Sequence, residues 1–370
     1  MLQNVKIKRI WRHMLSAEEI RLCEADPAKK AQVIAPYLKK WEKYLRPCYA
    51  EIKTMAEKAS VFASESDANE IKNDMLFCML AYGFLPSEYI GFGLAKKTPE
   101  ERNAYLSDLG TSAFGYTVNN IVEMQTVMNK ATSVVKYQRL FKRDFLVIGC
   151  DNDYEAFCGF VKKHPVFVLK KINSAMGKGV ELVDIAHCEK KQFFRKLISV
   201  DKWLLEERVE QKQEMACINA SSVNTVRCIT FKTKQGVVVP YCFLRAGRNG
   251  SFVDNGGAGG LLIGIDVNTG ILNTDGYDEY GWQYAAHPET GVKFQGFQIP
   301  QWDQMLEICK TAAQEETDMN YLSWDMAYSE CGWCVIEVNA IGQLIGPQIV
   351  QQRGIKSEVD TYLKDMQTVV

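Results

Sequence analysis

The spacing of apolar residues divides the chain into a helical part and a part of mixed strands and helices. From Asp67 to Tyr82 apolar residues recur with helical spacing, and Gly83 predicts the end of that helix. Capping boxes at Ser16-Ala17-Glu18-Glu19 and Thr98-Pro99-Glu100-Glu101 predict two further helix starts. Residues 1–125 are therefore expected to form a mainly helical region.

Residues 126–210 alternate between short apolar runs and segments with helical spacing. The expected strands are Phe145–Ile148, Val166–Lys171, Val180–Val183 and Trp203–Val209. The expected helices are Val134–Phe141, Tyr154–Lys163 and Glu189–Ile198. This alternation predicts a small α+β lobe.

Residues 211–370 form the third predicted part, in which antiparallel strands predominate. Turn signals are dense there, for example Lys234-Gln235-Gly236 and Asn268-Thr269-Gly270. A helix from Gln301 to Asp318 is expected before a final hairpin. The fold class expected for the whole chain is α+β.

The bulk composition limits the kind of partner. With 370 residues, of which 47% are hydrophobic and 24% charged, the chain is typical of a globular protein with two or three lobes. Its net charge of −1 argues against a nucleic-acid partner, and no apolar run is long enough for a membrane-spanning helix. The twelve cysteines stand singly in apolar segments, as free thiols do in a reducing cytoplasm. A cytoplasmic protein is expected.

The final hairpin is expected to bring Asp325 opposite Glu337. If Glu330-Cys331-Gly332 forms a three-residue loop with a left-handed glycine, Ser329 faces Trp333. Counting on in register, Asp325 then faces Glu337, and directly opposed side chains lie about 5 Å apart at Cβ.

Strand period two puts Asn339 on the same face as this pair. Mg²⁺ prefers carboxylate ligands together with phosphate oxygens and water, and two facing carboxylates are unfavourable without a cation. The hairpin therefore predicts a metal site of Asp325, Glu337 and Asn339, and the alternative is a half-exposed polar face. The residues expected to face the core instead are Met326, Ile336 and Val338.

The Asp325 … Glu337-x-Asn339 pattern resembles the metal site of the ATP-grasp superfamily. Motifs similar to its phosphate strand, mobile loop and adenine hinge come earlier, in the superfamily's order: Phe167-Val168-Leu169-Lys170, Asn173–Val180 and Trp203–Val209. Motifs that resemble the sugar-transfer-associated ATP-grasp family are Ser222–Arg227, Leu244-Arg245, Val253-Asp254-Asn255, Gly259-Gly260 and His287–Gly291. The resemblance covers roughly residues 126–355. It implies two α+β lobes that clasp ATP, with the helical region N-terminal to them.

The resemblance also implies which residues hold ATP. They are Lys130, Lys170, Gly177, Lys178, Gly179, Glu206, Glu207, Val209, Glu214, Asp254 and Asn255. A lysine at the end of an apolar strand can meet phosphate as a point charge, and glycines let backbone N–H groups approach phosphate. Three assignments stay open between neighbours: Lys170 or Lys171, Lys130 or Lys136, and Glu214 or Glu210.

Arg227 and Arg245 lie inside apolar strands, and buried arginine is rare unless it is paired. Both are candidates for catalytic contact with phosphate or carboxylate, together with Asn224 from the same motif as Arg227. The alternative is that the arginines pair with Asp254 or Glu337.

The resemblance implies an ATP- and Mg²⁺-dependent ligase. Such an enzyme joins a small-molecule carboxylate to an amine through an acylphosphate and releases ADP and phosphate. The sugar-transfer-associated family suggests sugar-linked substrates in bacterial surface polysaccharide (capsule or O-antigen) biosynthesis. The alternatives are an ATP-grasp kinase that phosphorylates a hydroxyl, and a nucleotide-binding protein without catalysis. No oligomeric state is predicted.

Overall fold

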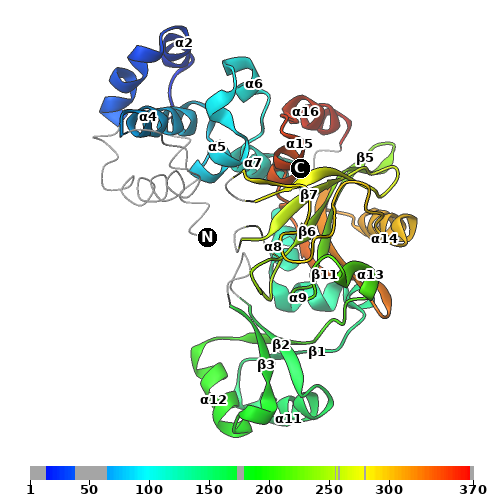
Figure 1. The fold of residues 1–370 in the computed structure, drawn as a ribbon. Coiled ribbons are helices and arrows are strands. Elements are labelled where there is room, and N and C mark those ends of the chain that lie inside the picture. Colours follow the sequence, from blue (N-terminus) through cyan, green and yellow to red (C-terminus); the bar gives the residue numbers. More distant parts are fainter. Residues whose placement is uncertain are drawn as a thin grey trace. The chain divides into compact units, whose positions relative to one another are not determined.

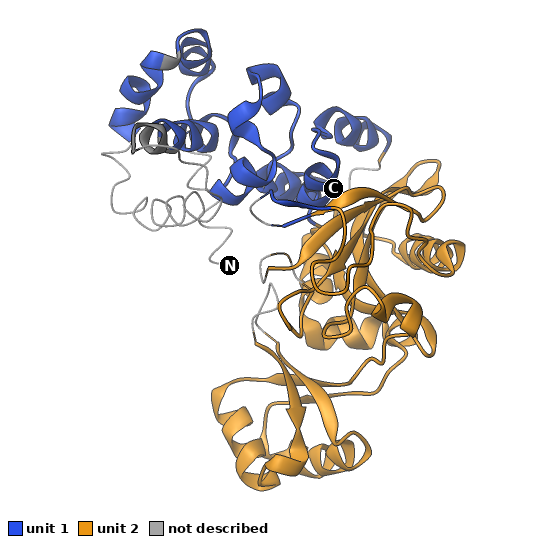
Figure 2. Cartoon of the chain, viewed as in Figure 1, with its two compact units in different colours: residues 1–117, 277–284, 343–365 blue, residues 118–276, 285–342, 366–370 orange. Residues whose placement is uncertain are grey.

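The computed structural model describes residues 14–37, 65–172, 179–254, 256, 259–278 and 281–366. The chain splits into two compact units (Figure 2). Unit 1 comprises residues 1–117, 277–284 and 343–365, and unit 2 comprises residues 118–276, 285–342 and 366–370. The described residues contain helices and two β-sheets, which confirms the α+β class. None of the described helices has both the length and the apolar character needed to cross a bilayer.

Unit 1 is built mainly from helices. Those of its N-terminal part are α2 (Ala17–Ala25), α4 (Glu65–Tyr82), α5 (Pro86–Gly91), α6 (Pro99–Asn103) and α7 (Asp108–Val118), with the 3-10 turns η1 (Pro27–Lys29) and η2 (Leu94–Lys96). Both expected capping boxes are present, at the starts of α2 and α6. Gly83 follows α4 with φ +78°, in the left-handed conformation expected of a glycine that ends a helix.

The two C-terminal helices, α15 (Ile345–Gln351) and α16 (Lys356–Asp365), also belong to unit 1. The side-chain amide of Gln348 accepts the N–H of Leu106 and donates to its carbonyl, both at 2.8 Å. The sequence prediction places these helices in the part that begins at residue 211. The structure differs because this pairing joins residues 242 positions apart, which no local pattern records.

Glu88 in α5 is a buried carboxyl group that makes unit 1 sensitive to pH. Its side chain is 1% exposed and accepts the N–H groups of Leu85 and Asp108, both at 2.6 Å. Burial raises the pKa of Glu88 to about 8 from an ordinary value of 4.5. Between these values the folded protein holds a proton that the unfolded chain has lost. Folding stability therefore falls as pH rises through this window.

We expect a lower melting temperature at about pH 8 than at about pH 5, and a smaller difference in Glu88→Gln, whose amide does not ionise. Burial also raises the pKa of Asp108, which acts in the same direction, so the variant narrows the difference without removing it. Circular-dichroism melts of both proteins at the two pH values measure the effect. An unchanged difference in the variant would contradict the role of Glu88.

The first sheet of unit 2 has four antiparallel strands in the order β1-β4-β2-β3. They are β1 (Phe145–Ile148), β2 (Val166–Lys171), β3 (Val180–Asp184) and β4 (Trp203–Glu207). Helices α11 (Tyr154–Lys163) and α12 (Lys190–Val200) pack on one face of this sheet (Figure 1), and the 3-10 turns η3 (Asp151–Asp153) and η4 (Ile185–His187) lie between the strands and helices in sequence. The bounds of β1, α11 and β2 are those predicted from the sequence.

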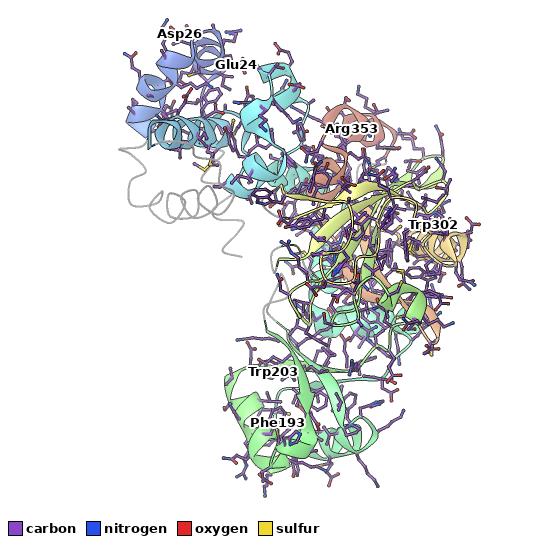
Figure 3. All side chains as sticks on the ribbon, in the orientation of Figure 1. Glu24, Asp26, Phe193, Trp203, Trp302 and Arg353 are labelled. Atoms are coloured by element: carbon purple, nitrogen blue, oxygen red, sulfur yellow. The ribbon has the colours of Figure 1, made fainter. Side chains whose placement is uncertain are left out.

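The two faces of this sheet have different roles. Phe167 and Leu169 of β2 and Trp203 and Leu205 of β4 form the core under α11 and α12; Figure 3 labels Trp203 in this lobe. Each fully buried side chain of this size contributes about 1.5–3 kcal/mol. Because successive strand residues point to opposite faces, the intervening polar residues of β2 and β4 point away from this core.

The second sheet has seven strands in the order β11-β10-β5-β6-β7-β8-β9. They are β5 (Thr225–Thr233), β6 (Gly236–Ala246), β7 (Leu261–Ile265), β8 (Leu272–Tyr277), β9 (Gln283–Tyr284), β10 (Tyr321–Ser329) and β11 (Gly332–Asn339). Helix α14 (Trp302–Glu315) packs against β5, β6 and β10, whereas α8 (Ile121–Met128), α9 (Lys130–Lys136) and α10 (Gln138–Phe141) contact β11. The short α13 (Gln213–Ala216) precedes β5. The single helix predicted over 134–141 is divided at Tyr137.

The β10–β11 hairpin reaches the expected pairing by an unexpected route. Gly332 is left-handed with φ +81°, as predicted, but the residue opposite Trp333 is Tyr328 rather than Ser329. From the turn to Met326, each residue of β10 pairs with the β11 residue one position before the predicted partner. Between Met326 and Asp325 the register shifts, because β11 contains one extra residue there, Ile336. Beyond the shift Asp325 faces Glu337, as the sequence predicts.

Candidate nucleotide and metal site

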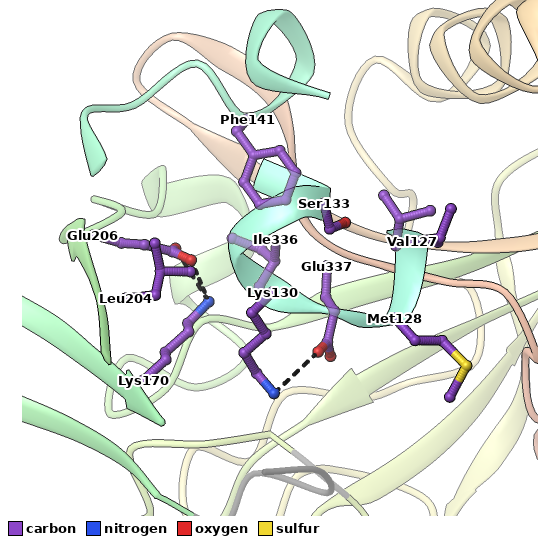
Figure 4. A pocket seen from close by; sticks show the side chains of 11 residues that line it. Val127, Met128, Lys130, Ser133, Phe141, Lys170, Leu204, Glu206, Ile336 and Glu337 are labelled. Atoms are coloured by element: carbon purple, nitrogen blue, oxygen red, sulfur yellow. Dashed lines mark hydrogen bonds and ion pairs between the residues drawn. The ribbon is translucent and has the colours of Figure 1, made fainter. Parts of the chain in front are cut away.

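Unit 2 contains a pocket, partly open to solvent, between β2 and β4 of the first sheet, β11 of the second, and the helices α8 to α10 (Figure 4). Its lining residues are Val127, Met128, Lys130, Ser133, Phe141, Lys170, Leu204, Glu206, Ile336, Glu337 and Val338. Lysines and carboxylates thus lie beside an apolar wall. Such a combination suits a ligand with a flat apolar part and a charged part.

Lys170 and Glu206 meet on the face of the first sheet that points away from its core. Nζ of Lys170 lies 3.0 Å from Oε1 and 3.1 Å from Oε2 of Glu206 (Figure 4). Arg143 donates to Oε2 from Nε at 2.8 Å and from a terminal nitrogen at 2.6 Å. Burial opposes the charge of Glu206, but these two cations keep its pKa below the ordinary value. The adenine contact predicted for Glu206 is therefore occupied by side chains in this structure.

Lys130 enters the pocket from the first residue of α9. The side chain of Asn129 caps this helix by accepting the N–H groups of Ala131 and Thr132, at 3.0 and 3.3 Å. Nζ of Lys130 then lies 4.0 Å from Oε1 of Glu337. Burial lowers the pKa of Lys130, and the charge of Glu337 opposes that shift.

The rival lysines of the sequence analysis are engaged elsewhere. Nζ of Lys171 lies 3.2 Å from Asp201, and Lys136 forms ion pairs of 2.8 and 3.0 Å with two glutamates. Neither lines the pocket, whereas Lys170 and Lys130 do. The pocket therefore contains Lys170 and Lys130, the candidate of each pair that is preferred from the sequence.

A buried charge cluster lies on the same face of the second sheet as Glu337. Arg227 faces Asp325 across β5 and β10 and donates to both of its oxygens, each at 2.6 Å. A terminal nitrogen of Arg245 lies 3.4 Å from Oδ2 of Asp325. Burial opposes the charge of Asp325, but the two arginines hold its pKa below the usual value.

Arg245 also pairs with Asp254, at 2.9 Å, and Asp254 accepts the backbone N–H of Thr225 at 3.0 Å. Burial opposes the charge of Arg245, while Asp254 and Asp325 raise its pKa. Both arginines are thus paired with acids, the alternative that the sequence left open. Arg245 pairs with Asp254, as that alternative states, whereas Arg227 pairs with Asp325 instead of Glu337.

Asn224 lies in a buried hydrogen-bonded environment just before β5. It is 0% exposed, and its amide nitrogen donates to the carbonyls of Met215 and Asn219, at 2.9 and 2.8 Å. Its own N–H donates to the side chain of Gln211 at 2.7 Å. Because all these partners lie in the segment that precedes β5, Asn224 holds this segment in place. Its side-chain oxygen has no hydrogen-bond partner among the described residues, and its catalytic contact stays a prediction.

The chemistry of the hairpin face fits Mg²⁺ and phosphate through two of the three predicted ligands. The side chain of Glu337 is 44% exposed. Asn339 shares its face, and the buried Nδ2 of Asn339 has no hydrogen-bond partner among the described residues. A buried donor without a partner is costly, so an acceptor such as a phosphate oxygen would satisfy Nδ2, while Oδ1 is the atom of Asn339 that could bind a cation. Both oxygens of Asp325 accept from Arg227, and its role as a third metal ligand stays a prediction.

The remaining hinge residues stand outside the pocket lining. The carboxylate of Glu207 accepts the N–H of Asp144 at 3.0 Å, and the N–H of Glu207 donates to the carbonyl of Asp144 at 2.9 Å. Val209 is half-buried, while Glu210 and Glu214 are both exposed, so the choice of the glutamate that holds ATP stays open between these two.

The loop that the sequence analysis places over the phosphates is described only at its end. Gly177, Lys178 and Asn255 lie outside the described residues. Gly179 has φ +71°, a conformation that favours glycine, and its carbonyl accepts the N–H of Lys171 at 2.9 Å.

Two residues, one beside the pocket and one in its lining, have no counterpart in the sequence prediction. Arg143 precedes β1 in a short polar stretch, and no local pattern marks it as the partner of Glu206. Ile336, predicted for the core, is half-buried and lines the pocket. The register shift of β11 places Ile336 as the extra residue, and this explains its different direction.

The fold is that of an ATP-grasp protein. Residues 112–364 match the family described as sugar-transfer associated ATP-grasp. The match covers more than half of the chain, and the chain therefore belongs to this family. The expected class of an ATP-grasp enzyme is confirmed, and enzymes of this class use ATP together with Mg²⁺.

Several solved structures are similar at low identity. D-alanine–D-alanine ligase from Helicobacter pylori is 13% identical, over 70% of this chain and 68% of that chain, with a TM-score of 0.44. N5-carboxyaminoimidazole synthetase from Staphylococcus aureus, complexed with ADP, is 12% identical over 68% and 55%, with a TM-score of 0.43. The ATP-grasp ligase PsnB, complexed with a minimal precursor, is 14% identical over 72% and 71%, with a TM-score of 0.42. None of the curated proteins matches the chain.

Proposed function

We propose that the protein is an ATP- and Mg²⁺-dependent carboxylate–amine ligase that forms an amide through an acylphosphate. The observation that carries the proposal is the pocket in which Lys170, Lys130 and Glu337 converge beside an apolar wall. Family membership supports ATP as the ligand of this pocket. The apolar wall would hold the base, and the two ammonium groups would bind phosphate oxygens as point charges.

In the proposed reaction, an oxygen of the substrate carboxylate attacks the γ-phosphorus, and ADP leaves. The amine then attacks the acyl carbon, and phosphate leaves with the C–O bond electrons. Mg²⁺, when held by Glu337 and Asn339, would neutralise the charge on the phosphates. Lys170 and Lys130 position the nucleotide, and such positioning is the main protein contribution to phosphoryl transfer.

The buried arginines are proposed to set the charge at the acceptor side. Asp325 fixes the plane of Arg227, and Asp254 fixes the plane of Arg245. The guanidinium of Arg245, held in this way, can meet an anion in a constant geometry. We assign Arg245 to the transferring phosphoryl group and Arg227 to the orientation of Asp325.

The proposed substrates are a small-molecule carboxylate and an amine, at least one of them linked to a sugar. This rests on the family's association with sugar transfer. We place the reaction in the cytoplasm, as a step of bacterial capsule or O-antigen biosynthesis. The cysteines that the structure describes are free thiols, in keeping with a reducing compartment.

The test is a reaction of the purified protein with ATP, Mg²⁺ and mixed pools of amino acids and nucleotide sugars, followed by mass spectrometry. A ligase releases free phosphate in step with ADP and yields a product whose mass equals acid plus amine minus water. Phosphate retained on an acceptor would instead identify a kinase. Nucleotide binding without turnover in any pool would contradict catalysis of either kind.

A further inference from the structure

Two cations pair with one buried carboxylate of the pocket: Lys170, which lines the pocket, and Arg143, which lies beside it. Glu206 is 3% exposed, and its oxygens accept from Lys170 at 3.0 and 3.1 Å and from Arg143 at 2.8 and 2.6 Å. One counter-ion is enough to compensate a buried carboxylate, so this group carries one positive charge more than its own neutralisation needs.

The two cations are held very differently. The side chain of Arg143 is 4% exposed, and it also donates to the carbonyls of Val335, at 2.6 Å, and Phe141, at 3.1 Å. The guanidinium is a rigid fork of donors, and these backbone acceptors fix its place. Lys170 has a flexible stem, lines the pocket, and is joined to the protein there through Glu206.

We propose that Arg143 is a positioning residue: it stays on Glu206 as a fixed counter-ion, so that Lys170 can turn from Glu206 to a nucleotide phosphate. Without Arg143, that turn would leave a buried carboxylate unpaired, which is strongly unfavourable. Lys170 would then remain on Glu206 and be lost to the phosphate. The inference rests on the proposed role of Lys170 and adds the residue that makes this lysine available.

The quantity that tests the proposal is the ratio of the dissociation constant for adenosine to that for ATP, at one fixed Mg²⁺ concentration. This ratio isolates what the phosphates contribute to binding. In Arg143→Met we expect it to fall about tenfold, the scale of one charge-assisted hydrogen bond. A purely structural role for Arg143 would weaken adenosine and ATP alike and leave the ratio unchanged, and that result would overturn the proposal.

A double variant gives the sharper test. In Arg143→Met/Glu206→Gln, residue 206 is uncharged and no longer holds Lys170. The ratio of the adenosine to the ATP dissociation constant should therefore equal the ratio measured for Glu206→Gln alone. A ratio as low as in Arg143→Met would overturn the proposal. If Arg143→Met does not fold, as judged by circular dichroism, Arg143→Gln removes the charge but keeps an amide for the backbone carbonyls, and the same fall in the ratio is expected.

Two further variants, Lys170→Met and Lys171→Met, distinguish an error in the role of Arg143 from an error in the assignment of the nucleotide site. Lys170→Met should lower the ratio, whereas Lys171→Met, which removes a pair with Asp201 outside the pocket, should leave it unchanged. A normal ratio in Lys170→Met would show that the nucleotide site is wrongly assigned. A low ratio in Lys170→Met with a normal ratio in Arg143→Met would refute the role of Arg143 alone.

Discussion

Replacing Glu337 by Gln is expected to reduce ATP turnover by about a hundredfold or more, because the loss of residues one step removed from a metal already costs about 10- to 100-fold in affinity or activity. Glu337 is the half-exposed carboxylate of the pocket, opposite Asp325 and 4.0 Å from Lys130. The amide keeps the shape of the side chain but removes the negative charge that a hard cation requires.

The measurement is ADP formation against Mg²⁺ concentration, once an acceptor pair is known. Glu330→Gln is the matched control, since Glu330 is an exposed glutamate in the turn of the same hairpin. We expect the control to behave like the wild type and Glu337→Gln to need more Mg²⁺ for its residual activity. Equal turnover in wild type and Glu337→Gln would remove Glu337 from the metal site.

Arg227→Met is expected to lower the free energy of unfolding by about 3–5 kcal/mol, the usual cost of removing one partner of a buried ion pair. Asp325 is 0% exposed and receives both of its short hydrogen bonds from Arg227. Arg245, whose nitrogen lies 3.4 Å away, compensates only part of the remaining charge, so the loss should fall toward the lower end of that range.

Urea unfolding followed by fluorescence measures this loss. Arg139→Met is the matched control: Arg139 pairs with Glu315 at the surface, with side chains 62% and 48% exposed, and exposed pairs contribute less than about 1 kcal/mol. Adding Asp325→Leu to Arg227→Met should recover part of the stability, because the unpaired buried charge is then gone. Similar losses for the two arginine variants would refute the argument from burial.

The parts of the fold that the sequence predicts well are those set by local pattern. The bounds of β1, α11 and β2 follow from runs of apolar residues between turn signals, and period two places Lys170 on the face opposite the core. The opposition of Asp325 and Glu337 is the one predicted, but the count along the hairpin reaches it only because the shorter turn and the register shift at Met326 offset each other.

What the sequence does not predict depends on partners that lie far apart. Arg143 finds Glu206 across 63 positions, and the arginine in β5 finds Asp325 across 98. Sequence reasoning can state that a buried arginine needs an acid, but several acids qualify and packing selects among them. The same holds for α15 and α16, whose place in unit 1 depends on contacts with residues near 105.

The extra residue in β11 has a consequence for comparing relatives of this chain. With the observed turn and regular pairing through Ile336, Asp325 would face Ile336 instead of Glu337, since a slip of one residue exchanges the two faces of a strand. A turn longer by one residue with no bulge produces the same spacing between the two carboxylates. Divergent members of the family can therefore have either a short turn with a bulge in the second strand or a longer turn without a bulge, with the same number of residues between the two acids. An alignment that counts residues between the acids will not detect how the chain reverses.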